Sequence, residues 1–200
     1  MKKIASSVIL ASSLLSCTAF AEEAGFFIGA NTAYGSIKAG DTSGFNAYRF
    51  GLVGGYKQFF TEEFGARYYL NLDTGTKYTK GSNNSQIQRF DLGLNVDALY
   101  NFLQSNDLEY GVFGGLSLDY AMNEEKLKRI DGPDGQGLDL GINFGLRLNY
   151  AQKHGVELFS RFGLTGVKLG KPDDSTQISP YSDEKIQTPY AVGLRYTYSF

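Results

Sequence analysis

Hydrophobic and polar residues alternate one by one along the end of the chain. From Tyr190 to Phe200 the even positions are aromatic or aliphatic, and the odd positions are Ala, Gly, Arg, Thr or Ser. A period of two places successive side chains on opposite faces of an extended backbone. The segment is therefore predicted to be a β-strand with one apolar face and one polar or small face.

The same alternation recurs along the whole chain. It marks eight segments, which are residues 25–37, 47–57, 64–73, 90–102, 108–120, 138–150, 156–165 and 190–200. The links between them are alternately long and short, and the number of strands is even. Short turns at one end and long loops at the other are typical of outer-membrane β-barrels, in which they are periplasmic and extracellular respectively.

The two faces of these segments differ in charge. Every charged residue within the segments lies in the class of positions that also holds most of the glycines, and the opposite class is mainly aliphatic or aromatic. An Arg or Lys facing the middle of the lipid would cost about 2–4 kcal/mol, so the charged face is predicted to line the lumen. The predicted fold class is all-β, an eight-stranded antiparallel up-and-down transmembrane β-barrel.

A soluble lipocalin-like barrel is the alternative, because the same alternation with the opposite polarity would put the apolar face inside. Tyrosines near the predicted strand ends favour the membrane interpretation, since Tyr is enriched at membrane–water interfaces. They are Tyr34, Tyr100, Tyr120, Tyr150 and Tyr198. After residue 21 no apolar run approaches the roughly 18–20 residues of a spanning helix, so a membrane-embedded form has to be a closed barrel.

The predicted lumen is lined by charges of both signs. An eight-stranded barrel is only wide enough for side chains to fill, and buried charges have to be paired because unpaired ones are costly. We therefore expect an ion-pair plug formed by Arg49, Arg67, Asp91, Asp97, Glu109, Asp119, Asp139, Arg147, Glu157, Arg161 and Arg195. A narrow ion path or proton relay lined by the same residues is the alternative.

The last strand also resembles the assembly signal at the carboxyl end of bacterial outer-membrane barrels. Its apolar face ends on an aromatic ring with no polar tail after it. The residues of this signal are Tyr190, Val192, Leu194, Tyr196, Tyr198 and Phe200. The expected partners are outer-membrane lipid, the barrel assembly machinery and an extracellular partner.

The amino end has the layout of a secretory signal peptide. Lys2 and Lys3 precede a short apolar run, and Ala19-Phe20-Ala21 fits a small-x-small cleavage site. The predicted domains are a cleaved signal peptide over residues 1–21 and an outer-membrane barrel over residues 22–200. Lipidation of Cys17 is the alternative, because Leu14-Leu15-Ser16-Cys17 has the form of a lipoprotein cleavage box.

Composition narrows the chemistry of the mature chain. Of 19 basic residues, Lys2 and Lys3 leave with the signal peptide, so 17 remain against 21 acidic ones, with no polybasic run to suggest nucleic acid. No cysteine is left for a disulfide or a Cys-ligated metal. The single histidine, His154, falls in a short periplasmic turn, and we interpret it as a solvated turn residue. We therefore expect no catalytic, cofactor-binding or metal-binding residues and no enzyme activity.

Several motifs follow one another along the chain. They are Gly55-Tyr56-Lys57-Gln58-Phe59-Phe60, Phe64-Gly65-Ala66-Arg67-Tyr68-Tyr69, Asp97-Ala98-Leu99-Tyr100-Asn101-Phe102, Tyr110-Gly111-Val112-Phe113-Gly114-Gly115, Asn143-Phe144-Gly145-Leu146-Arg147-Leu148 and Lys153-His154-Gly155-Val156-Glu157. Together, over roughly residues 48–200, they resemble the Helicobacter outer-membrane protein (Hop-type) family. The resemblance implies a surface-exposed outer-membrane barrel. Larger members carry adhesion on a long extracellular domain near the amino end, where this chain has only residues 39–46, so no binding residues are carried over.

The expected function is a structural or surface-interaction role in the cell outer membrane, adhesin-like in mode. Partners would be contacted through the loops at residues 76–86, 122–136 and 170–187. A narrow porin-like channel is the alternative, and an enzyme that uses carboxylates alone is a third class. The assignment of faces also predicts that Phe144→Arg impairs membrane insertion and that Gly145→Ser does not.

Overall fold

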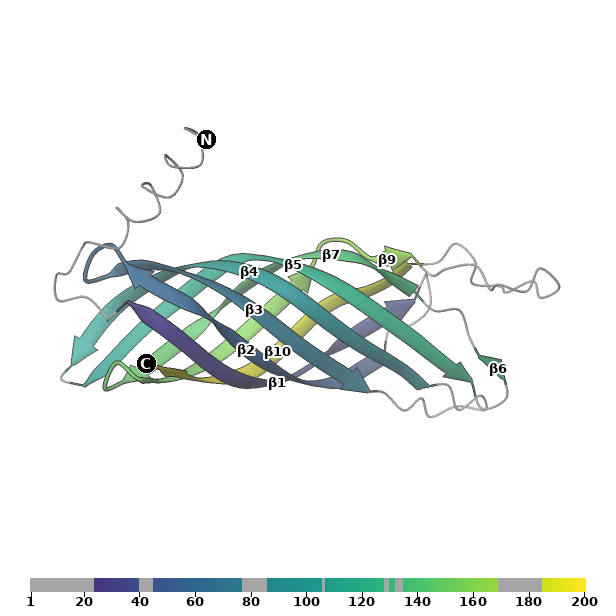
Figure 1. Ribbon diagram of the computed structural model, residues 1–200, viewed down its shortest axis with the longest axis horizontal. Helices are drawn as coiled ribbons and strands as arrows, with labels where there is room; N and C mark the ends of the chain where they lie inside the picture. Colours follow the sequence, from purple (N-terminus) through teal and green to yellow (C-terminus); the bar gives the residue numbers. More distant parts are fainter. Residues whose placement is uncertain are drawn as a thin grey trace, which may run out of the picture.

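The strands of this protein form one sheet that closes on itself (Figure 1). The structure is a computed structural model, and it describes residues 24–39, 45–76, 86–105, 107–127, 130–131, 135–168 and 185–200. The predicted signal peptide, with Cys17, and most of the predicted long loops lie outside these residues. The described part of the chain has no helix that is long and apolar enough to cross a membrane.

Eight long strands build the barrel. They are β1 (Gly25–Ala39), β2 (Phe45–Phe59), β3 (Phe64–Thr76), β4 (Gln86–Ser105), β5 (Leu108–Leu127), β7 (Gly135–Tyr150), β8 (His154–Gly163) and β10 (Lys185–Ser199). Two short strands, β6 (Ile130–Asp131) and β9 (Val167–Lys168), pair with β5 and β10. Each long strand is antiparallel to its neighbour in the chain, and β1 pairs with β10 to close the barrel. The predicted eight-stranded up-and-down barrel is confirmed.

The two ends of the barrel differ in their connections. One end, which we name the turn end, lies on the left in Figure 1, and there short links join β2 to β3, β4 to β5 and β7 to β8. β1 begins and β10 ends at this same end. The opposite end, which we name the loop end, has strands that reach further than predicted. β4 begins at Gln86 and β5 continues to Leu127, because Gln86 still pairs with Lys126. The predicted end of the loop at 86 agrees with the start of β4, whereas the predicted strand start at 90 and the predicted loop start at 122 were wrong by several residues.

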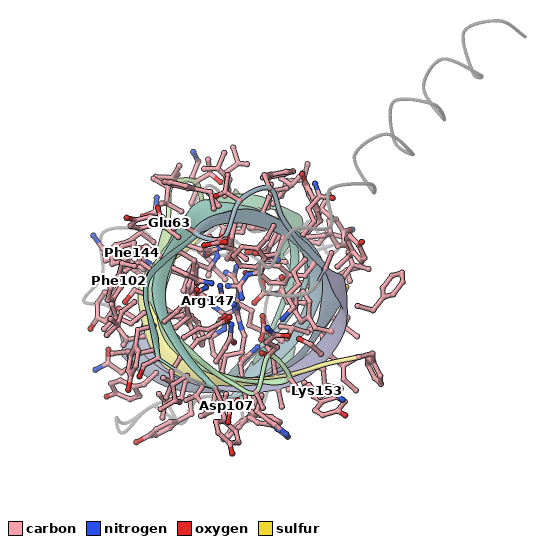
Figure 2. The ribbon with its side chains drawn as sticks, turned by 90° about the vertical axis from the view of Figure 1, so that its left-hand side faces the viewer. Glu63, Phe102, Asp107, Phe144, Arg147 and Lys153 are labelled. Carbon is pink, nitrogen blue, oxygen red and sulfur yellow. The ribbon has the colours of Figure 1, made fainter. Side chains whose placement is uncertain are left out.

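Side chains alternate between the lumen and the outer surface. Leu52 is 62% exposed and the adjacent Val53 is 5% exposed. Viewed from the turn end, Phe102 and Phe144 point away from the barrel axis and Arg147 points into the lumen (Figure 2). A soluble barrel would have its apolar face inside, whereas here the apolar face is outside, as in a membrane barrel. The predicted polarity of the two faces is confirmed.

Two irregularities change the register of the ladder. One lies between Ser36 and Lys38 in the pairing of β1 with β10, and the other follows Asn101 in β4. Pro189 lies at the first one, where its missing N–H is tolerated because the ladder is already interrupted. Beyond this bulge the even position Ile186 faces the lumen, although the even positions from Tyr190 onward face outward. The bulge therefore decides which residues close the lumen at the loop end.

Candidate functional site

Side chains fill the lumen of the barrel (Figure 2). All eleven residues predicted for the ion-pair plug face inward, and none is more than 8% exposed. They lie in two charged groups with a layer of asparagines between them. The turn-side cluster consists of Arg67, Asp97, Glu109, Arg147, Glu157 and Arg195, the asparagine layer of Asn71, Asn95 and Asn143, and the loop-side cluster of Arg49, Arg89, Asp91, Asp119, Asp139 and Arg161.

In the turn-side cluster, Arg67 joins strands from opposite sides of the barrel. Its guanidinium pairs with Asp97 on the neighbouring β4 at 2.8 Å and with Glu157 on β8, across the lumen. Glu157 also accepts from Arg195, its register partner on β10, at 3.1 Å. One carboxylate is thus shared by two guanidiniums. Because breaking a buried pair leaves a charge without compensation, this arrangement favours a filled lumen.

Aromatic rings surround these guanidiniums. The Cζ atom of Arg67 lies 4.4 Å from the ring centroid of Phe113, and that of Arg195 lies 4.8 Å from the centroid of Phe159. The ring of Tyr69 lies between the two arginines, at 5.1 and 5.0 Å. Cation–π contacts contribute about 0.5–2 kcal/mol each, more when they are desolvated. The turn-side half of the lumen is therefore closed by ion pairs and by ring contacts.

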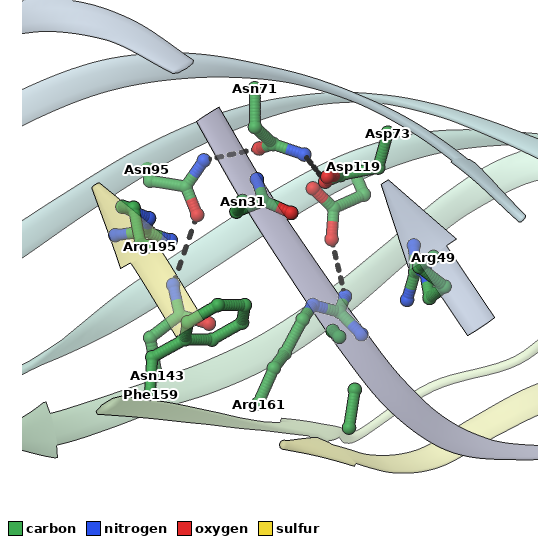
Figure 3. Close-up of a pocket in the computed structure, with 12 residues that line it drawn as sticks. Asn31, Arg49, Asn71, Asp73, Asn95, Asp119, Asn143, Phe159, Arg161 and Arg195 are labelled. Carbon is green, nitrogen blue, oxygen red and sulfur yellow. Dashed lines mark hydrogen bonds and ion pairs between the residues drawn. The ribbon is translucent and has the colours of Figure 1, made fainter. Parts of the chain in front are cut away.

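The asparagine layer forms a chain of hydrogen bonds across three strands (Figure 3). Asn143 Nδ2 donates to Asn95 Oδ1 at 2.9 Å, and Asn95 Nδ2 donates to Asn71 Oδ1 at 2.5 Å. A cavity of about 30 Å³ lies beside this chain and is also lined by Arg161 and Asp119, which form an ion pair at 2.5 Å. This volume and its polar lining suit a water molecule or two.

The loop-side cluster contains a cation that the sequence analysis missed. Arg89 donates to Asp91 at 2.8 Å and to Asp139 at 3.0 Å, and Asp91 also pairs with Arg49. Arg89 is 1% exposed. The predicted fourth segment began at residue 90, one position after Arg89, whereas β4 begins at Gln86. Arg89 has the same odd parity as Asp91, so the alternation itself could have identified it as an inward residue.

Apolar side chains close the lumen at the loop end. One inward position beyond the loop-side cluster, β2 and β5 carry Ala47 and Ala121, which are 3% and 0% exposed. Ile37, Val167 and Ile186 complete this apolar cap, and none of the three is more than 2% exposed. Sequence reasoning missed the cap. The inward position of Ile186 depends on the bulge in β10, and Val167 lies on β9, a short strand beyond the end of the predicted segment 156–165.

The charges inside the lumen balance over the part of the chain that the structure describes. Seven cations face seven anions, which are Arg49, Lys57, Arg67, Arg89, Arg147, Arg161 and Arg195 against Asp73, Asp91, Asp97, Glu109, Asp119, Asp139 and Glu157. Lys57 lies near the turn end, where its Nζ donates to the carbonyl oxygen of Gln152 at 3.4 Å. A neutral interior provides no net field that would draw ions of one sign into the lumen.

His154 lies on the outer surface near the turn end. It is the first residue of β8 and not a turn residue, and its Nδ1 lies 2.8 Å from the hydroxyl of Tyr196. Its ring also lies 5.4 Å from that of Tyr198. The interpretation of His154 as a solvated turn residue is corrected accordingly, because its ring belongs to a belt of aromatic side chains. Among the described residues, no group of three His, Cys, Asp or Glu side chains is placed to hold a metal ion.

The residues interpreted as an assembly signal lie on β10, which is bonded to β1 on one side and to β8 on the other. Tyr190, Val192, Leu194, Tyr196 and Phe200 are exposed on the outer surface, and Tyr198 is half-buried among them. The backbone N–H of Phe200 donates to the carbonyl of Phe26 at 3.0 Å, and its ring contacts that of Tyr198.

Solved structures of small outer-membrane proteins have the same fold. Neisserial surface protein A aligns with a TM-score of 0.56 and 14% identity over 89% of this chain and 99% of that one. OprG from Pseudomonas aeruginosa aligns with a TM-score of 0.56 and 13% identity over 92% of this chain and 100% of that one. A third structure is that of Ail, the attachment invasion locus protein of Yersinia pestis, in complex with the heparin analogue sucrose octasulfate. It aligns with a TM-score of 0.50 and 13% identity over 88% of this chain and 99% of that one. At such identities the likeness shows the fold alone.

Sequence similarity gives the family. No curated protein sequence is significantly similar to the chain. The sequence model of a family described as Helicobacter outer membrane protein matches residues 51–200. The match extends from β2 to the end of the chain, so it includes the motifs that carried the resemblance and most of the lumen residues described above. The chain therefore belongs to the Helicobacter outer membrane protein family.

Proposed function

We propose that the protein is a sealed outer-membrane scaffold that presents the segments at its loop end for contact with an extracellular partner. The observation that carries the proposal is the filled lumen, in which two cavities lined by described residues measure about 30 and 10 Å³. A barrel filled in this way leaves the loops as the parts that can vary and bind. Export by removal of residues 1–21 and assembly through β10 belong to the same proposal.

A narrow channel is the competing function. A solute would have to pass the Arg67–Glu157 pair, the asparagine layer, the Arg89–Asp139 pair and the apolar cap in succession. Separating even one buried ion pair costs about 3–5 kcal/mol. The sealed scaffold is therefore favoured over a steady conducting path.

A non-enzymatic role is part of the proposal. His154 is the only histidine of the chain, and it lies on the outer surface near the turn end rather than at the loop end. The carboxylates Asp91, Asp97 and Glu157 are held by arginines. A carboxylate that is engaged in a buried pair is a poor general acid or base, because moving a proton onto it breaks the pair.

Planar-bilayer recording of the refolded mature protein tests whether the lumen is sealed. We expect no steady openings from the wild type. We expect larger currents from the double variant Arg67→Ser, Glu157→Ser, which removes the cross-lumen pair, keeps the net charge of the lumen unchanged, and takes one partner from each of Asp97 and Arg195. Steady nanosiemens-scale openings of the wild type would contradict the scaffold and support the channel.

Attachment of whole bacteria tests the role of the loop end. In the matched variant, residues 171–183 are replaced by a short Gly-Ser link, which leaves every described strand unchanged. We expect equal amounts of both proteins in the outer membrane and weaker attachment of the variant to host-cell or matrix surfaces. Equal attachment by the two strains would remove the support for a surface-interaction role of this segment.

A further inference from the structure

β1 and β10 lie side by side up to the loop end of the barrel (Figure 1), and each strand carries one lysine there, Lys38 or Lys185. Lys38 is the register partner of Gln187, and Lys185 lies two residues from Gln187 on β10. Lys38 follows Ile37, and Lys185 precedes Ile186. Both isoleucines face the lumen and are 1% exposed. Lys38 and Lys185, named here the rim lysines, therefore lie on the outer face, where Lys185 is exposed and Lys38 is half-buried. Diagonal neighbours of this kind are about 7–8 Å apart, so both ammonium groups can reach one ligand.

The rim lysines lie close enough to repel each other, and like charges near one another on one face of a sheet are destabilising. Among the residues that the structure describes, neither Lys38 nor Lys185 makes an ion pair. The ladder therefore favours an anionic ligand at this edge of the barrel.

The rim lysines stand apart from the other cations of the barrel. The seven buried Arg and Lys side chains of the described strands face the lumen. Elsewhere on the outward face of the loop end, the described side chains are uncharged and include Asn46, Thr74, Met122 and Gln136. Among the outward side chains that the structure describes at this end, the positive charge thus lies at Lys38 and Lys185.

An aromatic belt lies directly below the rim lysines. The rings of Tyr34 and Tyr48 are 4.9 Å apart, and Tyr190 is 40% exposed on the adjacent strand. Tyrosines on an outer surface mark the membrane–water interface. Lys38 follows Tyr34 by four residues on the same face, so its Cα lies about 10 Å nearer the cell exterior along a tilted strand. This is the level of the lipid headgroups.

We propose that the rim lysines bind the phosphorylated headgroup of a lipid in the outer leaflet. Phosphate oxygens are strong acceptors, and the lysine ammonium is a common partner for them. Below the phosphate, Val192 and Leu194 offer an apolar surface for the acyl chains and are 44% and 55% exposed. A free phosphate ion would make no use of that surface, so the ligand is a lipid. The inference does not depend on whether the lumen conducts.

Native mass spectrometry of the folded mature protein in detergent micelles tests this lipid site. The probes are bisphosphorylated lipid A, the same glycolipid without phosphates, and inorganic phosphate. We expect the wild type to retain only the first. A lysine near a lipid phosphate changes the affinity by about fivefold, so the double variant Lys38→Gln, Lys185→Gln should retain on the order of 25-fold less.

The matched control is Lys153→Gln, which removes an exposed lysine at the turn end and should retain lipid A like the wild type. Heat-modifiable gel mobility shows that each variant is folded. Equal retention of lipid A by the wild type and the double variant would overturn the proposal. So would equal retention of the phosphate-free glycolipid, or displacement of lipid A by inorganic phosphate alone.

Discussion

At the scale of one residue, the two faces of the sheet differ in the space that they leave for a side chain. Gly114 and Gly145, on the adjacent strands β5 and β7, illustrate the difference. A Cβ atom at Gly145 would lie 2.8 Å from two ring carbons of Phe113 and against the carbonyl oxygen of Leu158. At Gly114 the nearest atom would be the carbonyl oxygen of Asn143, at 3.9 Å. A side chain is therefore excluded at the inward position and accommodated at the outward one.

We expect Gly145→Ala to destabilise the barrel by about 1–3 kcal/mol, because its methyl group overpacks the lumen against Phe113. The matched variant Gly114→Ala should be neutral or stabilising by up to about 1 kcal/mol, since it only restricts the unfolded chain. Urea unfolding in detergent micelles measures both. Equal losses would contradict the assignment of faces. For the same steric reason we now expect Gly145→Ser to destabilise the barrel, contrary to the tolerance that the sequence predicted, whereas Phe144→Arg is still expected to impair insertion.

The sequence predicts which charged residues face inward but not how they pair. Alternation puts Arg67 and Glu157 on the inward face, and their pairing joins positions 90 residues apart on opposite sides of the barrel. That contact depends on the tilt of the strands and on closure of the sheet, neither of which is a local property. Arg89 was missed for a simpler reason, because the predicted start of the fourth strand was placed after it.

At the scale of one element, the existence of each strand was predictable and its ends were not. β4 and β5 are each 20 residues long, whereas the predicted segments ended where the apolar alternation fades. Backbone pairing continues beyond that point, because strands outside the membrane do not need apolar side chains on their outer face. The bulge near Pro189 was also missed, since a bulge is defined by the register with the partner strand.

The link between β7 and β8 carries backbone strain. Ala151 and Gln152 have φ values of 51° and 59°. The left-handed conformation costs an ordinary L-residue about 1–2 kcal/mol and glycine nothing. Positive φ at both central residues is typical of a type I′ turn, which favours Asn-Gly. We expect Ala151→Asn with Gln152→Gly to stabilise the barrel by about 1–2 kcal/mol.

The rate of unfolding in urea and the unfolding midpoint both measure the effect of this turn. Glu62→Gly is the matched control, because none of the described residues between β2 and β3 has a positive φ. It should be neutral or destabilise by up to about 1 kcal/mol through the entropy of the unfolded chain. A similar gain from both changes would show that relief of left-handed strain is not the cause.

At the scale of the whole molecule, closure depends on the last strand. Among the described strands, β1 pairs with β2 on one side and with β10 on the other, so β10 closes the barrel. Phe200 follows β10 in the chain and is 69% exposed. We expect Phe200→Ala to lower the fraction of folded protein in the outer membrane of cells, with little effect on the stability of the purified barrel. Phe102→Ala is the control, since Phe102 is also an outward ring, 55% exposed. Heat-modifiable mobility of membrane fractions measures both.

The fold class followed from regularities that extend over the entire chain. The period of two, the even number of segments and the alternation of short and long links each constrain the barrel as a whole. The apolar cap and the rim lysines could not be predicted in this way, because they arise where β1, β9 and β10 are brought together from distant parts of the sequence.

The contact between β1 and β10 also sets the timing of biogenesis. β10 follows the other described strands in the chain, so the barrel cannot close until β10 has been synthesised and has reached β1. Until then β1 has an unsatisfied edge, which is prone to aggregation. A product that stops early would keep two such edges, and periplasmic chaperones and proteases would meet it in that state. The pairing of β1 with β10 thus acts as a check that β10 is present before maturation.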